Sequence, residues 1–187
     1  MEKILRKNLT TSQKTQMMTR MAILTAIGAV LYRIEIPLLV AHQKIDPSLI
    51  PSLVGGIMMG PLAGVTIELL KNFTHLFVTS SAGIGELINF IVGSSLIIPV
   101  CIIYRSKQTM TSYIVAALIA TVSIFAVGAL CNYIFTPVFY AVMGLPSPST
   151  TEIMAFVSAS FLLNGLKAAV TLIPTFFMLP MLKRNSL

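Results

Sequence analysis

One apolar stretch near the C-terminus limits the folds open to this chain. It runs from about Ile153 to Leu182 and holds Asn164 and Lys167 in its middle. A helix rises about 1.5 Å per residue and a bilayer core is about 30 Å thick, so the stretch is long enough to cross a membrane. A lysine at the centre of such a helix costs about 2.5–3.5 kcal/mol on insertion scales and needs a partner, a cavity or water. Because Asn164 and Lys167 share one helix face, they predict a polar site inside a membrane protein.

The composition supports the membrane class and argues against a nucleic-acid-binding protein. Hydrophobic residues make up 56% of the chain and charged residues only 10%, whereas about a quarter of a soluble domain is usually charged. The net charge is +7, but nine of the thirteen basic residues precede the first apolar run, lie in one short loop with Arg105 and Lys107, or close the chain. This placement fits the positive-inside rule for cytoplasmic segments.

The less common side chains add two expectations. Cys101 and Cys131 lie within apolar runs, so no disulfide framework is expected. Tryptophan is absent, which leaves tyrosine to form the aromatic belt at the membrane interface. The tyrosines near predicted helix ends are Tyr32, Tyr104, Tyr113 and Tyr140.

The apolar runs predict an all-α integral membrane protein, a bundle of six transmembrane helices in a single domain over residues 1–187. Basic segments at both termini place both ends in the cytoplasm and require an even number of spans. The run from Ser52 to Val78 is too long for one span, and Gly60-Pro61 divides it, because the residue before a proline leaves helical geometry. Residues 1–16 form a basic cytoplasmic lead, and the spans are predicted at about residues 17–37, 47–59, 61–78, 85–104, 112–140 and 153–182.

Polar side chains recur every three to four residues on the predicted helix over residues 61–78. They are Glu68, Lys71, Asn72 and His75, which therefore form one stripe. Glu68 and Lys71 are close enough in sequence to neutralise each other, so a purely structural role for Glu68 is as well supported as a binding role.

The other candidate polar groups also gather in the outer half of the predicted bundle or in the loops above it. A channel needs polar residues at all depths, so this asymmetry favours a cup, open to the outside, that captures a small ligand. Asparagine offers both a donor and an acceptor and lysine offers three donors, a set suited to the edge of a planar amide-containing heterocycle. The full set is Lys44, Asp46, Lys71, Asn72, Glu86, Asn89, Asn132, Asn164 and Lys167.

Five blocks of the sequence resemble one known family in order and spacing. The blocks are KIDPSLIP, GPLAGVTIELLKN, TSSAGIGELINFIVG, CNYIFTP and NGLKAAVT. The family comprises the riboflavin-specific substrate-binding (S) components of energy-coupling factor (ECF) vitamin transporters, and the resemblance covers about Ala22 to the end of the sixth span. It implies a six-helix S component in the bacterial plasma membrane that binds riboflavin. It also implies association with a transmembrane coupling protein and two cytoplasmic ATPases.

The same resemblance implies roles for the candidate residues. Asn132, Asn164 and Lys167 would hydrogen-bond the uracil-like edge of the flavin ring, and the segment 44–46, with Lys44 and Asp46, would cap the pocket. The family often has a second acidic residue where this chain has Leu49, which leaves open how the ribityl tail is held. Three further residues fall in motifs near the pocket: Asn72, Glu86 and Asn89.

Small residues on the first span carry a second expectation. Ala22 and Ala26 form a small-xxx-small pattern, which taken alone more often serves packing between helices of one chain. The resemblance changes that reading, because the two alanines match the motif through which S components dock on the coupling protein.

Two alternatives stay open. The same scaffold would serve an S component for another vitamin or precursor, such as a hydroxymethylpyrimidine or pantothenate. A small membrane enzyme acting on a lipid head group would need clustered carboxylates or histidines, as in DxxD or HxxxH patterns, and the sequence has neither.

The sequence also has no GxxxxGK[ST] phosphate loop, so the energy for transport must come from elsewhere. No catalytic residue, metal site or resident cofactor is expected, riboflavin being the transported substrate.

Overall fold

The computed structural model describes residues 10–34, 36–37, 44–79 and 81–184, and the statements below concern these residues. A short 3-10 helix, η2 (Leu76–Val78), follows the third α-helix, and β1 (Ile36–Pro37) pairs antiparallel with β2 (Lys44–Ile45). Apart from this two-stranded ribbon the described elements are helical, which confirms the predicted all-α class. The α-helices are α1 (Thr11–Tyr32), α2 (Leu49–Met59), α3 (Pro61–His75), α4 (Ile84–Lys107), α5 (Met110–Val142) and α6 (Thr150–Arg184).

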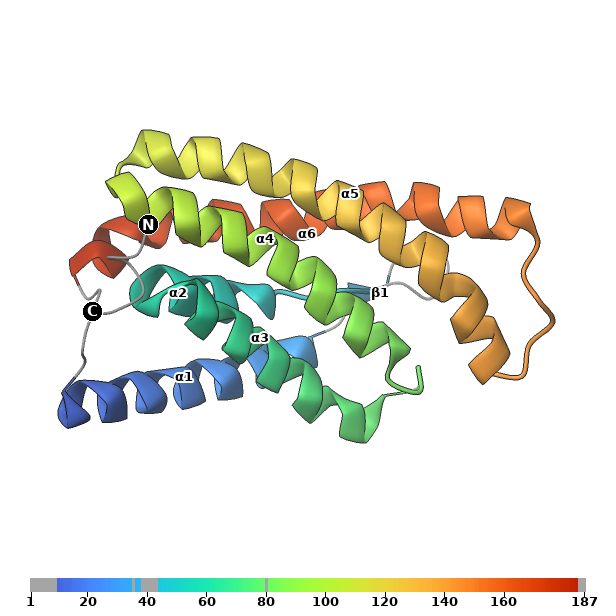
Figure 1. The fold of residues 1–187 in the computed structure, drawn as a ribbon, viewed down its shortest axis with the longest axis horizontal. Helices are drawn as coiled ribbons and strands as arrows, with labels where there is room; N and C mark the ends of the chain where they lie inside the picture. Colours follow the sequence, from blue (N-terminus) through green and yellow to red (C-terminus); the bar gives the residue numbers. More distant parts are fainter. Residues whose placement is uncertain (1–9, 35, 38–43, 80, 185–187) are drawn as a thin grey trace.

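Successive helices run in alternating directions along one bundle (Figure 1). The start of α1, the α2–α3 junction, the α4–α5 turn and the end of α6 lie at one end, which we call the turn end (left in Figure 1). The α3–α4 and α5–α6 connections lie toward the opposite end, the loop end. Helix α2 contacts α1, α3, α4 and α6 and is therefore the most enclosed element.

The break that divides α2 from α3 lies where the sequence predicts it. Gly60 has φ 115° and ψ 161°, a conformation that L side chains rarely adopt, and Pro61 occupies the first position of α3. The resulting α2 is short and buries Leu49, Leu53 and Ile57. A helix covered on all sides is apolar all round, so α2 shows no polar face.

Two capping boxes shift the helix ends from the predicted positions. Thr10 and Gln13 cap α1 reciprocally, so the helix begins at Thr11 and takes in part of the predicted lead; it ends at Tyr32 rather than near residue 37. Thr109 and Ser112 do the same for α5. The basic residues expected in a loop after the fourth span therefore belong to the last turn of α4, and only residues 108–109 separate α4 from α5.

Three helices of the described chain are long and apolar enough to cross a membrane by themselves. They are Ile84–Lys107, Met110–Val142 and the part of α6 over Thr150–Leu182. The segment Leu49–Met59 is a shorter apolar helix. Many large apolar side chains on the outside of the bundle are exposed, including Leu118 and Val122 on α5. Such a surface is stable in lipid and not in water, so the protein is membrane-embedded.

The prediction that the tyrosines form an aromatic belt at the membrane interface is wrong for three of them. Tyr32, Tyr104 and Tyr113 are buried within the bundle, Tyr113 to 2% exposure. The Tyr113 hydroxyl donates to the carbonyl oxygen of Leu172 on α6 at 2.9 Å, and the Tyr104 and Tyr113 rings meet edge to face. These rings turn inward because neighbouring helices cover the helix ends on which they lie.

Candidate ligand-binding site

A buried ion pair on α3 lies at the base of the polar site. The Lys71 ammonium lies 2.8 Å from Oε1 of Glu68, and both side chains are 0% exposed. Asn72 Nδ2 donates to the same carboxylate oxygen at 3.0 Å and to the Glu68 carbonyl oxygen at 2.8 Å. The predicted stripe on this helix is confirmed, and so is the mutual neutralisation of Glu68 and Lys71. Pairing of this kind is required, because a single charge buried without a partner costs several kcal/mol.

One arm leads from this pair to the segment before α2. Lys71 Nζ donates to Ser48 Oγ at 2.7 Å. Ser48 in turn donates twice to Oδ1 of Asp46, through its backbone N–H at 2.9 Å and through its hydroxyl. The other Asp46 oxygen, Oδ2, lies 4.0 Å from the Lys167 ammonium. Asp46 therefore links the segment before α2 to α6.

These contacts govern the pKa of Asp46. Burial acts to raise the pKa of this carboxyl, but the Lys167 and Lys71 charges and the Ser48 hydrogen bonds act in the opposite direction. Their combined effect holds the pKa of Asp46 below its usual value of 3.8. The carboxylate is thus ionised at neutral pH and is available as an acceptor.

A second arm leads from the same ion pair to the same lysine. Asn89 Nδ2 on α4 donates to Asn72 Oδ1 at 2.9 Å. Lys167 Nζ donates to Asn89 Oδ1. The two arms close a ring of side chains contributed by α3, α4, α6 and the segment before α2. The ring, so called below, consists of Asp46, Ser48, Glu68, Lys71, Asn72, Asn89 and Lys167.

The two late asparagines meet at a glycine of α5. Asn132 Nδ2 donates to the carbonyl oxygen of Gly128 at 2.9 Å. A Cβ atom added to Gly128 would lie 2.0 Å from Asn164 Nδ2, so the Asn164 amide packs directly against the glycine backbone. Asn164 is buried and Asn132 is half-buried. Gly128 thus brings the two predicted asparagines together at the α5–α6 contact.

Glu86 takes part in a neighbouring cluster at the start of α4. Its Oε1 lies 2.8 Å from His75 Nδ1, and Ser81 Oγ donates to its Oε2 at 2.7 Å. The His75 ring stacks on Tyr32 of α1 with ring centroids 3.9 Å apart. Lys71 Nζ lies 5.1 Å from the centroid of the same Tyr32 aromatic side chain. Because Lys71 belongs to the hydrogen-bonded ring defined above, this cluster adjoins that ring.

The structure brings most of the predicted site residues to the loop end. Asp46, Asn72, Asn89 and Lys167 belong to the ring itself. For Lys44 the structure describes only the backbone, which forms part of β2, because its side chain lies outside the described parts of the chain.

Sequence reasoning missed Ser48, Gly128 and the role of Tyr32. A serine two residues after an aspartate is a common turn signal and could have indicated Ser48. Leu49, which replaces a frequent acidic residue of the resembled family, is fully buried in the apolar core.

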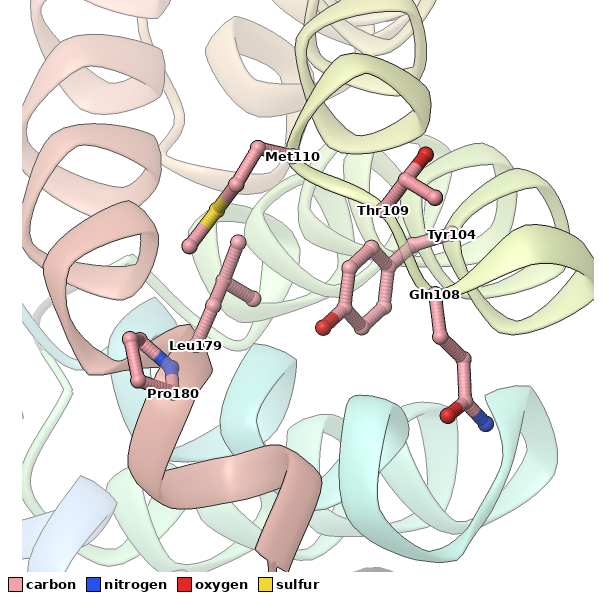
Figure 2. Close-up of a pocket in the computed structure, with 6 residues that line it drawn as sticks. All are labelled: Tyr104, Gln108, Thr109, Met110, Leu179 and Pro180. Atoms are coloured by element: carbon pink, nitrogen blue, oxygen red, sulfur yellow. The ribbon is translucent and has the colours of Figure 1, made fainter.

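A separate cavity of about 390 Å³ lies at the turn end. Figure 2 shows its lining side chains, which come from the end of α4, the two-residue connection that follows it, the start of α5 and the last part of α6. None of them carries a charge, and none belongs to the ring. The lining residues are Tyr104, Gln108, Thr109, Met110, Leu179 and Pro180.

The outer face of α1 is apolar and carries the two small residues singled out above. Ala22 and Ala26 are exposed, and so are Met18, Ile23 and Ile27 on the same helix. This face packs against no described element.

The fold and the site together define a membrane-embedded protein that holds polar groups at one end of a helical bundle. The family model for the substrate-specific component of ECF transporters matches residues 16–182, and the chain belongs to this family. Its members are components of transporters rather than enzymes.

Two curated relatives and one solved structure are similar over most of the chain. The riboflavin transporter RibU of Staphylococcus aureus (strain TCH60) is 29% identical over 168 residues, which cover 88% of this chain and 88% of the relative. The riboflavin transporter FmnP of Bacillus subtilis (strain 168) is 27% identical over 164 residues, covering 84% and 86%. A solved S component of a bacterial ECF transporter superposes with a TM-score of 0.77 at 27% identity, covering 92% of this chain and 98% of that one.

Proposed function

We propose that this chain is the riboflavin-binding S component of an ECF importer, which captures the vitamin outside the cell and delivers it through a shared energising module. The observation that carries this proposal is the position of Lys167. Its ammonium group is held between Asp46 and Asn89 at the loop end, on the same helix face as Asn164. The two curated relatives, both riboflavin transporters, point to the same substrate.

The chemistry of the proposed contacts suits a flavin. Its uracil-like edge presents carbonyl acceptors and one N–H donor, which lysine and asparagine side chains can satisfy. We assign Asn132, Asn164 and Lys167 to this edge. The segment 44–46 would cap the bound vitamin, and the remaining candidates, Asn72, Glu86 and Asn89, would surround the pocket without an assigned contact.

We further propose six membrane spans with both termini in the cytoplasm. The alternating helix directions bring the start of α1 and the end of α6 to the turn end, together with Arg105 and Lys107 in the last turn of α4. By the positive-inside rule this end faces the cytoplasm of a bacterial cell, and the ring faces outward. The chain has no phosphate loop, so a transmembrane coupling protein and two cytoplasmic ATPases would supply the energy.

Binding is tested first by an absorption spectrum of the detergent-purified protein and by quenching of riboflavin fluorescence. We expect a yellow preparation with flavin near-stoichiometric to protein. Lys167→Ala and Asn164→Ala should each weaken binding by about 1–3 kcal/mol, because each leaves a polar partner unpaired. Leu166→Ala, on the exposed side of the same helix turn, is the matched control and should bind normally. A colourless protein that fails to quench riboflavin would contradict the proposed ligand and favour an S component for another vitamin.

Docking is tested separately from binding. Replacing both Ala22 and Ala26 by leucine should abolish co-purification with the coupling protein, because the larger side chains prevent close helix approach. Riboflavin binding should persist, since both alanines are exposed on the outer face of α1. Val122→Leu, on the exposed face of α5, is the control for added bulk on the surface. Normal assembly of the double variant would exclude this face of α1 as the docking surface.

A further inference from the structure

We propose that the buried Glu68–Lys71 pair is a positioning element of the binding site, which sets the direction of the hydrogen bonds in the ring so that two acceptors face Lys167. The inference rests on the proposed function, because Lys167 is there a ligand-binding group. Neither member of the pair touches the ligand; each acts through one neighbour.

The acidic side of the pair fixes the orientation of two amides. An ionised carboxylate only accepts hydrogen bonds, so the Glu68 carboxylate, at 3.0 Å, acts with the Glu68 backbone carbonyl, at 2.8 Å, to turn Asn72 Nδ2 toward Glu68. Asn72 Oδ1 then points outward and accepts from Asn89 Nδ2 at 2.9 Å. The remaining atom of that second amide, Asn89 Oδ1, is left to accept from Lys167.

The basic side acts in the same way on the other arm. An ammonium group only donates, so Ser48 Oγ must accept from Lys71 and its hydroxyl hydrogen is directed elsewhere. That hydrogen goes to Asp46 Oδ1. The carboxylate is thereby oriented with Oδ2 toward Lys167, 4.0 Å away.

The surrounding helices are shaped to admit this pair. A Cβ at Gly93 of α4 would lie 2.7 Å from Glu68 Oε1, and one at Gly28 of α1 would lie 3.3 Å from the Lys71 side chain. Small residues on two separate helices therefore make room for the two charges. Because the pair is fully buried, its effect on a ligand must pass through Ser48 and Asn72.

The test removes one link of the ring with the smallest possible change. Ser48→Ala deletes the hydroxyl that joins Lys71 to Asp46, and we expect riboflavin to bind about 5- to 10-fold more weakly, as for loss of one buried hydrogen bond. Ser52→Ala is the matched control, because Ser52 is equally buried one turn further along α2 and its hydroxyl has no hydrogen-bond partner in the described structure. It should bind riboflavin with unchanged affinity.

A double-mutant cycle separates positioning from a general loss of structure. If Ser48 acts through Asp46, then Ser48→Ala should change riboflavin affinity by less than about 2-fold in an Asp46→Ala background. Additive effects of the two substitutions on the logarithm of Kd would overturn the inference while leaving the proposed function intact. Failure of the unsubstituted protein to bind riboflavin would instead contradict the proposed function. In that case the same cycle can be measured on ligand-free protein, with the unfolding midpoint as the readout. Non-additive effects of Ser48→Ala and Asp46→Ala on the midpoint would support the ring, and additive effects would overturn it.

The ion pair itself is tested by removing both charges together. Glu68→Leu with Lys71→Met keeps the buried volume apolar, so the protein should still fold, whereas either substitution alone leaves a buried charge unpaired. We expect this double variant to bind riboflavin about tenfold or more weakly at a near-normal unfolding midpoint. Unchanged affinity in the folded double variant would overturn the positioning role.

Discussion

The two ends of the bundle are stabilised by different kinds of interaction. At the loop end, side chains from four elements meet in directional hydrogen bonds and ion pairs that close on Lys167. Toward the turn end, α4, α5 and α6 pack through fully buried apolar side chains such as Val100 and Leu179. Directional contacts can select a ligand by its hydrogen-bonding pattern, whereas apolar packing cannot. The comparison therefore assigns the proposed recognition of a ligand to one end and structural support to the other.

The same contrast bears on delivery of the ligand. A polar ligand held at the loop end faces a close-packed apolar interior in the direction of the turn end, and the ring has no counterpart among the residues that line the cavity there. Passage along the bundle axis would require that core to open, at a large cost in packing. If the chain delivers a ligand across the membrane as proposed, release on the opposite side therefore needs movement of the bundle itself.

The largest expected effect comes from breaking the ion pair at the loop end. Glu68→Ala leaves the Lys71 ammonium fully buried without its carboxylate and should lower the free energy of unfolding by about 3–5 kcal/mol. Thermal unfolding of the ligand-free protein in detergent measures this loss. Lys107→Ala, at the exposed end of α4, should cost less than about 1 kcal/mol. An unfolding midpoint equal to that of the wild type would mean that this end does not depend on the pair.

A smaller effect is expected where the two asparagines meet. In Gly128→Ala the new Cβ would lie 2.0 Å from Asn164 Nδ2, so the amide must move. We expect a loss of about 1–3 kcal/mol in the free energy of unfolding, with weaker riboflavin binding. Gly165→Ala is the control, because its Cβ would meet only the Phe125 ring at 3.5 Å, an ordinary contact. Equal behaviour of the two variants would exclude Asn164 from the site.

A substitution at the turn end should change the stability of the protein and leave its riboflavin affinity unchanged. Tyr113→Phe removes the hydroxyl that donates to the Leu172 carbonyl, which should cost about 0.5–1.5 kcal/mol of unfolding free energy. Riboflavin affinity should not change, since the proposed recognition site lies at the other end. Tyr133→Phe, at an exposed tyrosine of α5, should alter neither property. A weaker Kd for Tyr113→Phe would show that the two ends are coupled and would break the comparison.

The smallest effect near neutral pH is expected from titration of Asp46. Its pKa in the folded protein is depressed, so its stabilising contribution is fully present above the usual value of 3.8 and is lost as the pH falls through the depressed value. Between pH 5 and pH 8, titration of Asp46 should therefore change neither stability nor riboflavin affinity, as unfolding midpoints and fluorescence titrations across that range can check. Below pH 5, the loss of stability that comes from protonation of Asp46 should be absent in Asp46→Asn. If Asp46→Asn lost as much stability at low pH as the wild type, that loss would have to be assigned to another carboxyl.

Much of the fold could be predicted because two signals act locally. The Gly60-Pro61 break follows from the restricted backbone before a proline, and the α3 stripe follows from helical periodicity. Lys167 was identifiable because a lysine inside an apolar helix must have a partner.

The partners themselves could not be predicted. The contact between Lys167 and Asn89 joins residues 78 positions apart, and it depends on how α4 and α6 are rotated about their axes. The same rotation turns Tyr104 and Tyr113 inward instead of toward the membrane surface. The extension of α1 to Thr11 was missed because its capping box lies in a stretch that composition marks only as polar.

The ring carries two ammonium and two carboxylate groups, so its formal charges cancel. A neutral cluster produces little field beyond its own dimensions and does not draw solutes toward it from a distance. Encounter between the ring and the proposed ligand, an uncharged vitamin, is then governed by diffusion and by access to the loop end. The association rate constant should consequently be almost independent of ionic strength, in contrast to binding proteins that attract their ligands through a charged entrance.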